Sequence, residues 1–147
     1  MRAMIPMAWC AASALLVAGS GCATSGADAA NMPYTQMGGA EGIEGIVDDL
    51  LERILEDDRI NVQFADTDIV RFREKLIEQL CVEAGGPCTY TGLSMQESHA
   101  GREIDDAQFN ALVEDLVAVM EARKVPIGAQ NRLLKKLAPM HREIVVP

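Results

Sequence analysis

The chain has 147 residues, of which 49% are hydrophobic and 4% aromatic, and its formal net charge at pH 7 is −9. So acidic a surface repels nucleic acid and anionic membrane headgroups, which excludes both as expected partners. The length suffices for a single domain with a sizeable core.

The first 21 residues have the layout of an export signal. Arg2 is followed by an apolar stretch that is too short to span a membrane and that ends in small residues. The segment LLVAGSGC resembles a bacterial lipobox, in which the cysteine receives lipid and becomes the new N-terminus, although Gly19 replaces the usual leucine. We therefore expect residues 1–21 to be a lipoprotein-type signal peptide and Cys22 to be the lipid anchor.

Two other readings of the N-terminus stay open. Cleavage after Ala29 would release a soluble periplasmic form, and an uncleaved anchor would need about 20 apolar residues, more than the segment offers. Under the lipoprotein reading, Ala23 after the lipidated cysteine favours the outer over the inner membrane, and residues 22–32 form a flexible tether. Removing the signal leaves a net charge of −10, so any membrane attachment is expected from lipid and not from a basic face.

Apolar residues between positions 43 and 55 recur at the i, i+3, i+4 and i+7 spacing of an amphipathic helix. The glycine pair at 38–39 breaks the chain just before this helix. Its buried face is expected to hold Ile43, Ile46, Val47, Leu50, Leu51, Ile54 and Leu55.

A second helix is expected to begin near Asp68, with Thr67 or Asp66 as its cap. It ends at the Gly-Gly-Pro break of residues 85–87. Its apolar side is expected to hold Ile69, Phe72, Leu76, Leu80 and Ala84.

A third helix opens at Asp105, which can cap it while Gln108 reaches back. Its apolar stripe consists of Phe109, Leu112, Val113, Leu116, Val117 and Met120. A fourth helix begins around Pro126, a residue suited to a first turn, and is expected to bury Ile127, Leu133, Leu134, Leu137 and Met140. Because no stretch alternates as a strand would, the predicted fold class is all-α.

Two cysteines remain once Cys10 leaves with the signal and Cys22 takes lipid. Cys81 and Cys88 flank a Gly-Gly-Pro turn in a compartment that permits disulfides, which favours a bridge over two separate buried thiols. A bridge that closes so short a loop contributes about 2–3 kcal/mol in the chain-entropy estimate.

The connection from 85 to 104 is long for a compact domain, and it allows one helical turn that ends at His99. Imidazole is a common ligand of zinc and of haem iron, but it is also often just a capped surface residue. Zinc needs several clustered ligands, and His141, the only other histidine, is far away in the sequence. A single histidine suffices for haem, because the porphyrin supplies the other four nitrogens.

The ordered motifs GGAEGI, ILEDDRI, FADTD, GGPCTYTG, MQESHAG, FNALVEDL and VPIGAQNRLLKKLAPM resemble a group I truncated haemoglobin. The resemblance runs from about Tyr34 to Val145 and assigns residues 33–147 to one truncated globin domain. It implies a two-on-two helical sandwich around haem b.

The resemblance also implies the contacts of that haem. His99 would be the proximal iron ligand, with its other ring nitrogen bonded to a backbone carbonyl. Arg73 would face a propionate, although a solvated surface charge explains it equally well. The remaining expected contacts are Leu51, Phe72, Leu76 and Leu80 on the distal side, and Met95, Ile104 and Phe109 on the proximal side.

The chain departs from the family at the distal positions. Group I members usually have a Phe-Tyr pair where this chain has Leu50-Leu51, and a glutamine where it has Leu76. Leucine donates no hydrogen bond, so this departure predicts fast O₂ dissociation, easy autoxidation and better retention of CO and NO.

The function that follows from the resemblance is reversible binding of diatomic gases by a monomeric protein. A haem-based redox or gas sensor served by an unidentified reductase remains an alternative, as does a secondary NO-dioxygenase or peroxidase activity. An alternative from another class of function is a haem-free helical lipoprotein that uses the globin scaffold as a binding module.

Overall fold

The computed structural model describes residues 30–145, so the expected signal peptide, Cys22 and most of the expected tether lie outside the described residues. In this part of the chain every regular element is a helix, and no helix has the length and apolarity to cross a membrane. The elements are α2 (Pro33–Gln36), α3 (Gly39–Glu56), η1 (Asn61–Phe64), α4 (Ile69–Glu83), α5 (Met95–His99), α6 (Asp106–Ala122), α7 (Ile127–Leu137), η2 (Ala138–Met140) and α8 (His141–Ile144).

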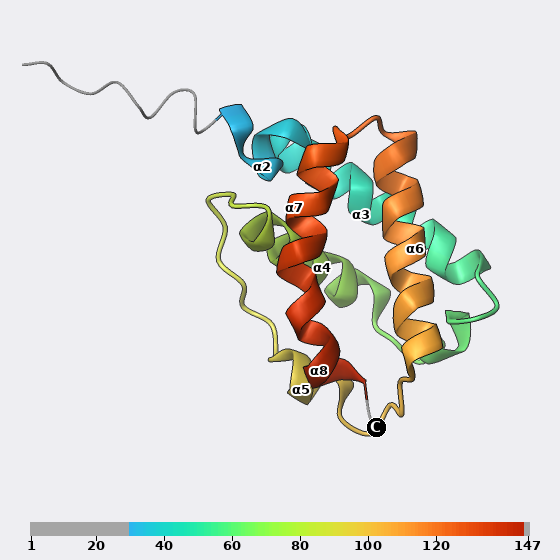
Figure 1. The fold of residues 1–147 in the computed structure, drawn as a ribbon. Coiled ribbons are helices and arrows are strands. Elements are labelled where there is room, and N and C mark those ends of the chain that lie inside the picture. Colours follow the sequence, from blue (N-terminus) through green and yellow to red (C-terminus); the bar gives the residue numbers. More distant parts are fainter. Residues whose placement is uncertain (1–29, 146–147) are drawn as a thin grey trace, which may run out of the picture.

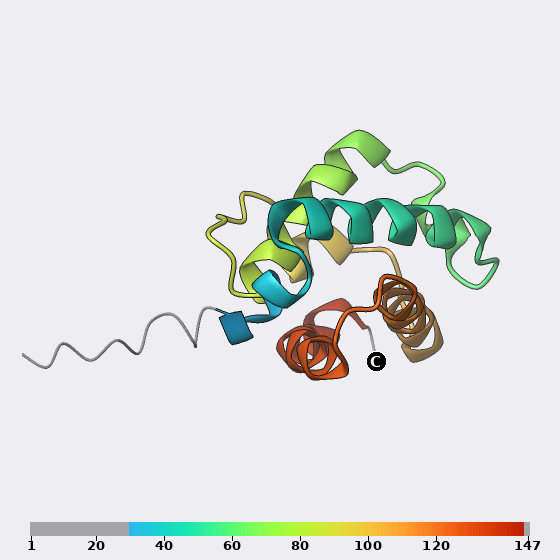
Figure 2. The same cartoon turned by 90° about the horizontal axis from the view of Figure 1, so that it is seen from above.

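The four long helices form two layers of two. Figures 1 and 2 show α3 and α4 in one layer and α6 and α7 in the other, with α3 crossing over α6. The short α5 lies beside α8 at one end of the molecule, and α2 lies against α3 and α7 at the other. This arrangement confirms the predicted all-α, two-on-two sandwich.

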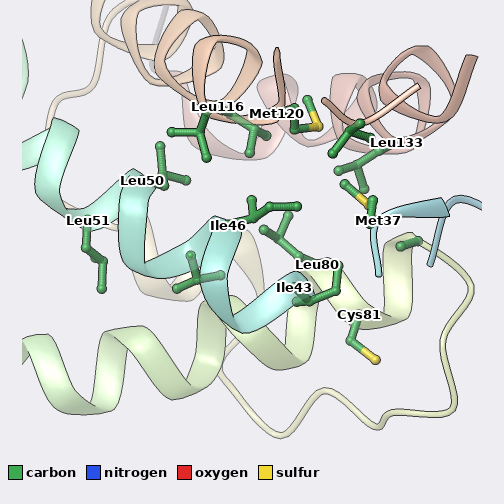
Figure 3. Close-up of a cluster of buried hydrophobic side chains, with 14 of the residues drawn as sticks. Met37, Ile43, Ile46, Leu50, Leu51, Leu80, Cys81, Leu116, Met120 and Leu133 are labelled. Carbon is green, nitrogen blue, oxygen red and sulfur yellow. The ribbon is translucent and has the colours of Figure 1, made fainter. Parts of the chain in front are cut away.

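Helix α3 forms the centre of the core. Six of its apolar side chains are buried, as the periodicity predicts, and several of them point towards α6 and α7 in Figure 3. Leu55 was expected in the same face but is 56% exposed, because it lies at the edge of the apolar stripe, about 100° around the helix from the buried Ile54. The buried residues of α3 are Ile43, Ile46, Val47, Leu50, Leu51 and Ile54.

Caps fix where the helices begin. Asp105 accepts a hydrogen bond from the backbone of Gln108, whose side chain bonds back, which confirms the predicted capping box of α6. The cap of α4 is Asp68 and neither of the two residues before it, because its carboxylate accepts from the N–H of Arg71. At the start of α7 the predicted burial of Ile127 is wrong, since this side chain is 65% exposed.

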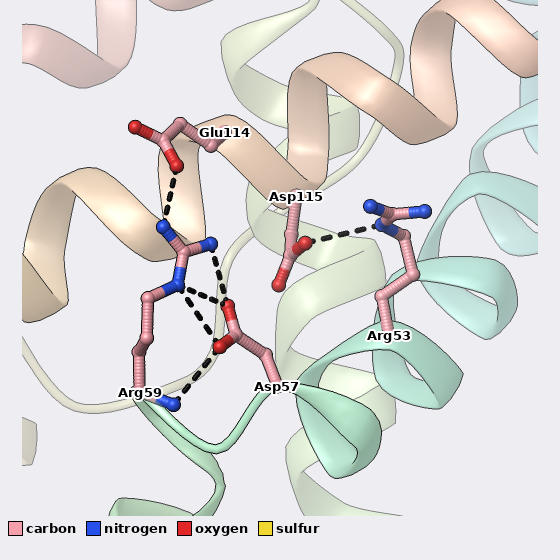
Figure 4. Close-up of polar contacts among 5 residues, drawn as sticks. All are labelled: Arg53, Asp57, Arg59, Glu114 and Asp115. Carbon is pink, nitrogen blue, oxygen red and sulfur yellow. Dashed lines mark hydrogen bonds and ion pairs between the residues drawn. The ribbon is translucent and has the colours of Figure 1, made fainter.

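Ion pairs join the end of α3 to α6. The Nε atom of Arg53 donates to the buried Asp115 at 3.1 Å, and Arg59 bridges Asp57 and Glu114 (Figure 4). These contacts fix the corner between α3 and η1 against α6, and so hold one end of the space between the two layers.

Candidate cofactor site

A cavity of about 290 Å³ lies between the two helical layers, and most of its walls are apolar. Side chains from α3, η1, α4, α5, α6, α7 and α8 reach it, so it occupies the middle of the sandwich. Its apolar lining consists of Leu50, Ile60, Phe64, Phe72, Leu76, Leu80, Met95, Ile104, Phe109, Leu112, Val113, Leu116, Leu137, Met140 and Ile144. A concave, mostly apolar cavity with few polar groups is the usual form of a cofactor site.

His99, the last residue of α5, contributes its imidazole to this cavity. Its Nδ1 atom lies 2.7 Å from the carbonyl oxygen of Met95 and 3.0 Å from the hydroxyl of Ser98. A carbonyl only accepts, so Nδ1 carries the proton and Nε2 keeps its lone pair. Nε2 has no hydrogen-bond partner within residues 30–145. This is how proteins present a metal-ligating histidine.

The short helix that carries His99 is held by its own sequence. Ser94 and Glu97 form a capping box, in which each side chain bonds the other residue's backbone N–H. Such a cap compensates for the low intrinsic stability of a five-residue helix, and it fixes the direction of the imidazole.

Six of the eight side chains predicted to contact a cofactor line the cavity together with His99. They come from three different parts of the chain, and α4 contributes half of them. Phe72 also packs against Phe64 of η1, with ring centroids 5.2 Å apart. The six are Phe72, Leu76, Leu80, Met95, Ile104 and Phe109.

Leu51 is not part of the cavity lining, so the distal contact predicted for this residue stays a prediction. Leu50 lines the cavity instead, whereas Leu51 is buried in the core and in Figure 3 points towards α4. Successive residues of a helix point about 100° apart, and both leucines belong to the same wide apolar stripe. The periodicity therefore does not tell which of the two faces a ligand.

Arg73 does not line the cavity either, and its predicted contact with a propionate stays a prediction. Its Nε atom lies 2.5 Å from Oδ1 of Asp48 on α3, and its Nη2 atom lies 4.0 Å from Oε2 of Glu44. The hydrogen bond from Arg73 lowers the pKa of the Asp48 carboxyl. The guanidinium therefore forms an ion pair that joins α4 to α3 on the outside of the sandwich.

Two other cations, Lys75 and Arg102, line the cavity, and the sequence reasoning missed both. Lys75 lies three residues after Phe72, so the helical spacing that selects Phe72 and Leu76 could have found it. Its ammonium donates to Glu78 at 2.7 Å and to Thr91 at 2.6 Å.

The neighbours of these cations hold them at the cavity wall. The Lys75 hydrogen bond, aided by the N–H of Thr91, lowers the pKa of the Glu78 carboxyl to about 2. Arg102 donates to the carbonyls of Gln63 at 2.8 Å and Ser98 at 3.2 Å. Both positive charges are therefore anchored on different sides of the cavity lining, one on α4 and one just after α5.

Polar side chains also reach the cavity from α4 and the following loop. The amide of Gln79 donates to the sulfurs of Met95 at 3.4 Å and Met140 at 3.2 Å, which are weak acceptors. The hydroxyl of Tyr90 donates to the carbonyl of Leu93 at 2.7 Å, and burial raises its pKa. Hence the cavity as a whole is not entirely apolar, although its wall at Leu50, Phe72 and Leu76 is.

The structure contains a disulfide between Cys81 and Cys88, whose Cα atoms are 5.9 Å apart. Cys81 is buried near the end of α4, and Cys88 lies on the exposed loop that leads to Tyr90 and on to α5. The bridge therefore ties the start of this loop to the helix that forms one wall of the cavity.

His141, the second histidine, lies outside the cavity lining. Its Nε2 atom is 2.7 Å from Asp106, and its ring meets the edge of Phe109 at a centroid distance of 4.8 Å. Nor does the described part of the chain hold a group of three His, Cys, Asp or Glu side chains that could bind a metal ion. A metal ion bound by His99 would therefore take its remaining ligands from a cofactor.

Comparison with known proteins agrees with this geometry. The family model described as bacterial-like globin matches residues 32–146. A group 1 truncated hemoglobin of Mycolicibacterium paratuberculosis is 32% identical over 111 residues, which cover 76% of this chain and 82% of the relative. Another, from Synechocystis sp., is 34% identical and covers 63% of this chain and 78% of the relative.

Solved structures show the same fold. The truncated hemoglobin of Tetrahymena pyriformis in its Fe(III) form superposes with a TM-score of 0.75 at 24% identity, covering 78% of this chain and 98% of that one. The 2/2 hemoglobin of Synechococcus sp. gives a TM-score of 0.65 at 22% identity, covering 77% and 94%. With a family model that spans almost every described residue and relatives above 30% identity, this chain belongs to the bacterial-like globins and, among them, to the group 1 truncated haemoglobins.

Proposed function

We propose that this truncated haemoglobin binds diatomic gases reversibly at a haem whose iron is held by Nε2 of His99. Haem is the cofactor of its family, and when bound it supplies the iron to which a gas molecule binds. The observation that carries the proposal is the orientation of His99: Nδ1 is occupied by Met95, and the unpartnered Nε2 belongs to a side chain of the cavity wall.

The other residues of the cavity fit the chemistry of a haem. Its flat, apolar porphyrin needs apolar walls, which α4 and α6 provide with side chains such as Leu76, Phe109 and Leu112. Its two propionates need cations or donors at the rim, and Lys75 and Arg102 offer one cation each. Arg73 has no part in this assignment, because Asp48 already neutralises it.

The apolar part of the cavity wall determines which gases the haem would retain. This part is formed by Leu50, Phe72 and Leu76. None of these side chains donates a hydrogen bond, and O₂ bound to haem iron carries partial negative charge that a donor would stabilise. We therefore expect O₂ to leave quickly, while CO and NO, which depend less on hydrogen bonds, stay longer. This apolar wall favours reversible gas binding over oxidation chemistry. Breaking an O–O bond needs a proton donor next to the bound oxygen, and these three side chains have none.

The test uses the two histidines of the chain as a matched pair. Purified wild-type protein is expected to show a haem Soret band that shifts on reduction and on addition of CO. His99→Ala should lose that band or lose the spectrum of a histidine-ligated iron, whereas His141→Ala should keep it. An unchanged spectrum in His99→Ala would show that another group holds the iron, and the absence of haem from wild type would leave only a haem-free binding module.

For its location we propose an exported protein that is attached to the periplasmic side of a membrane by lipid at Cys22. The support is the sequence of residues 1–22 alone: an apolar stretch, small residues and then a cysteine. Metabolic labelling with a fatty-acid analogue should label the wild-type protein but not the Cys22→Ser variant. Equal labelling of wild type and variant would refute the anchor.

A further inference from the structure

The net charge of −9 conceals a strongly basic segment. Between residues 122 and 142 the chain has six basic residues and no acidic one. Residues 39–121, in contrast, contain 20 acidic and 6 basic residues. Since the segment 122–142 includes all of α7, the fold gathers positive charge on one of its four long helices.

Three of these basic residues share the outer side of α7, and we call them the α7 basic face: Arg132, Lys135 and Lys136. All three are exposed, and they follow the i, i+3, i+4 spacing of one helix face, while Gln130 and Leu133 are buried on the inner side of α7. Within the described residues neither lysine has an ion-pair partner. The face thus presents uncompensated positive charge to its surroundings.

The start of the described chain lies beside the α7 basic face. Arg132 donates to the carbonyl of Asn31 at 2.8 Å and to the side chain of Gln36 at 2.6 Å, and α2 packs against α7 (Figure 1). Helix α2 itself has no charged residue. Asn31 follows Cys22 by nine positions, and a segment of this length spans at most about 32 Å. Anything attached at Cys22 is therefore kept near this face.

The acidic residues that dominate the net charge lie largely elsewhere. Helices α3 and α4, which carry many of them, form the other layer of the sandwich, as Figure 2 shows. Charges further apart than a Debye length, about 8 Å at physiological salt, are largely screened from each other. The α7 basic face can therefore attract an anionic surface that the chain as a whole would repel.

We propose that the α7 basic face docks on an anionic lipid surface to which the N-terminal segment tethers the protein. The inference rests on the proposed lipid at Cys22, and it changes the expectation that attachment comes from lipid alone. Each basic residue close to an anionic membrane strengthens binding about fivefold. Three together are enough to select one orientation of a domain that the tether already holds nearby.

This orientation has a consequence for the cavity. Leu137 lies on the inner side of α7 and lines the cavity, and Met140 and Ile144, which follow in η2 and α8, do so too. Docking by α7 would therefore place the gas-binding site next to the membrane, where apolar gases concentrate, and turn α3 and α4 towards the aqueous compartment.

The experiment uses the four lysines of the native chain as reporters. The full chain is reconstituted with vesicles of zwitterionic lipid, or with the same vesicles plus 30–40% anionic lipid, and is then acetylated with an amine-reactive reagent. Mass spectrometry gives a rate for each lysine. We expect Lys135 and Lys136 to react at least about fivefold more slowly on anionic vesicles, with recovery in high salt, and Lys75 in the cavity to react equally on both.

A pair of variants separates the face from the net charge. Lys135→Gln should reduce the protection of Lys136 by about fivefold, whereas Arg71→Gln, which removes an exposed charge on α4, should leave it unchanged. Equal rates on both kinds of vesicle, with the chain still co-sedimenting, would overturn the docking proposal and leave the anchor intact. Co-sedimentation with anionic vesicles alone would support the face and refute the anchor, and co-sedimentation with neither would refute both.

Discussion

The Nδ1 atom of His99 lies 2.7 Å from the carbonyl oxygen of Met95, one turn earlier in the same short helix. The contact fixes the tautomer of the imidazole, because a carbonyl accepts only from a protonated nitrogen. It also fixes the ring's rotation, since α5 is itself held by its capping box. The orientation of Nε2, the proposed iron ligand, is thereby fixed, and its electron density depends on what Nδ1–H bonds to.

Ser98→Ala should change this electron density without removing the ligand. The Ser98 hydroxyl lies 3.0 Å from Nδ1, and its own proton points to backbone carbonyls of α5, so its oxygen accepts from the imidazole. Without it, the iron–histidine stretching frequency of the reduced protein should fall by a few wavenumbers in resonance Raman spectra, with haem content unchanged. Ser94→Ala serves as the control, because it weakens the helix cap but does not touch the ring; the same shift in both variants would mean that helix stability, not the hydroxyl, sets the frequency.

Leu76→Gln should slow the release of O₂. Leu76 lines the cavity on α4, and an amide there could donate the hydrogen bond that the apolar wall lacks. One such bond contributes about 1–1.5 kcal/mol, which corresponds to a five- to tenfold slower dissociation. Stopped-flow displacement of O₂ by CO measures the rate, and Leu76→Met controls for the change in shape. Identical rates in the two variants would place Leu76 away from the bound gas.

The sequence predicted the four long helices because each carries its own periodic signal, whereas their layered arrangement was expected only from the resemblance to a known family. The apolar stripe of residues 43–55, the capping box at Asp105 and the break at 85–87 are all local, and none depends on a partner. Elements without such a signal were missed, for example the four-residue helix η1. Burial at helix ends was also misjudged, since Leu55 and Ile127 fit the apolar spacing but are exposed.

The site was predictable only where a position on a helix settles what a side chain faces. Phe72 and Leu76 lie in the middle of the apolar stripe of α4 and do line the cavity. Leu50 and Leu51 both lie within the stripe of α3, so the choice between them depends on how α4 packs. Which cation points inwards likewise depends on long-range pairing: Asp48 of α3 draws Arg73 outwards, and nothing near it in the sequence indicates this.

Removing the disulfide should destabilise the protein by about 2–3 kcal/mol, the chain-entropy value for so short a loop. Cys81→Ala combined with Cys88→Ser should lower the urea midpoint under oxidising conditions, with an unchanged slope. The same comparison with dithiothreitol present should remove most of the difference, because the wild type then lacks the bridge as well. A variant as stable as the oxidised wild type would show that the bridge does not constrain the unfolded chain.

Glu78→Gln should alter how stability depends on pH. The Glu78 carboxyl has its pKa lowered from 4.5 to about 2 by the hydrogen bond from Lys75 and then by the N–H of Thr91. A group whose pKa falls on folding stabilises the native state above its unfolded pKa, and this stabilisation is lost as the pH drops from about 4.5 to about 2. The variant should therefore be less stable than wild type at pH 6 and equally stable near pH 2.

Urea unfolding followed by circular dichroism at several pH values between 6 and 2 measures the difference. Glu74→Gln, an exposed change on the same helix that leaves the contact between Lys75 and Glu78 in place, serves as the matched control. If the Glu78→Gln difference did not change between pH 6 and pH 2, the contact between Lys75, Glu78 and Thr91 would not hold α4 to the loop that leads to His99.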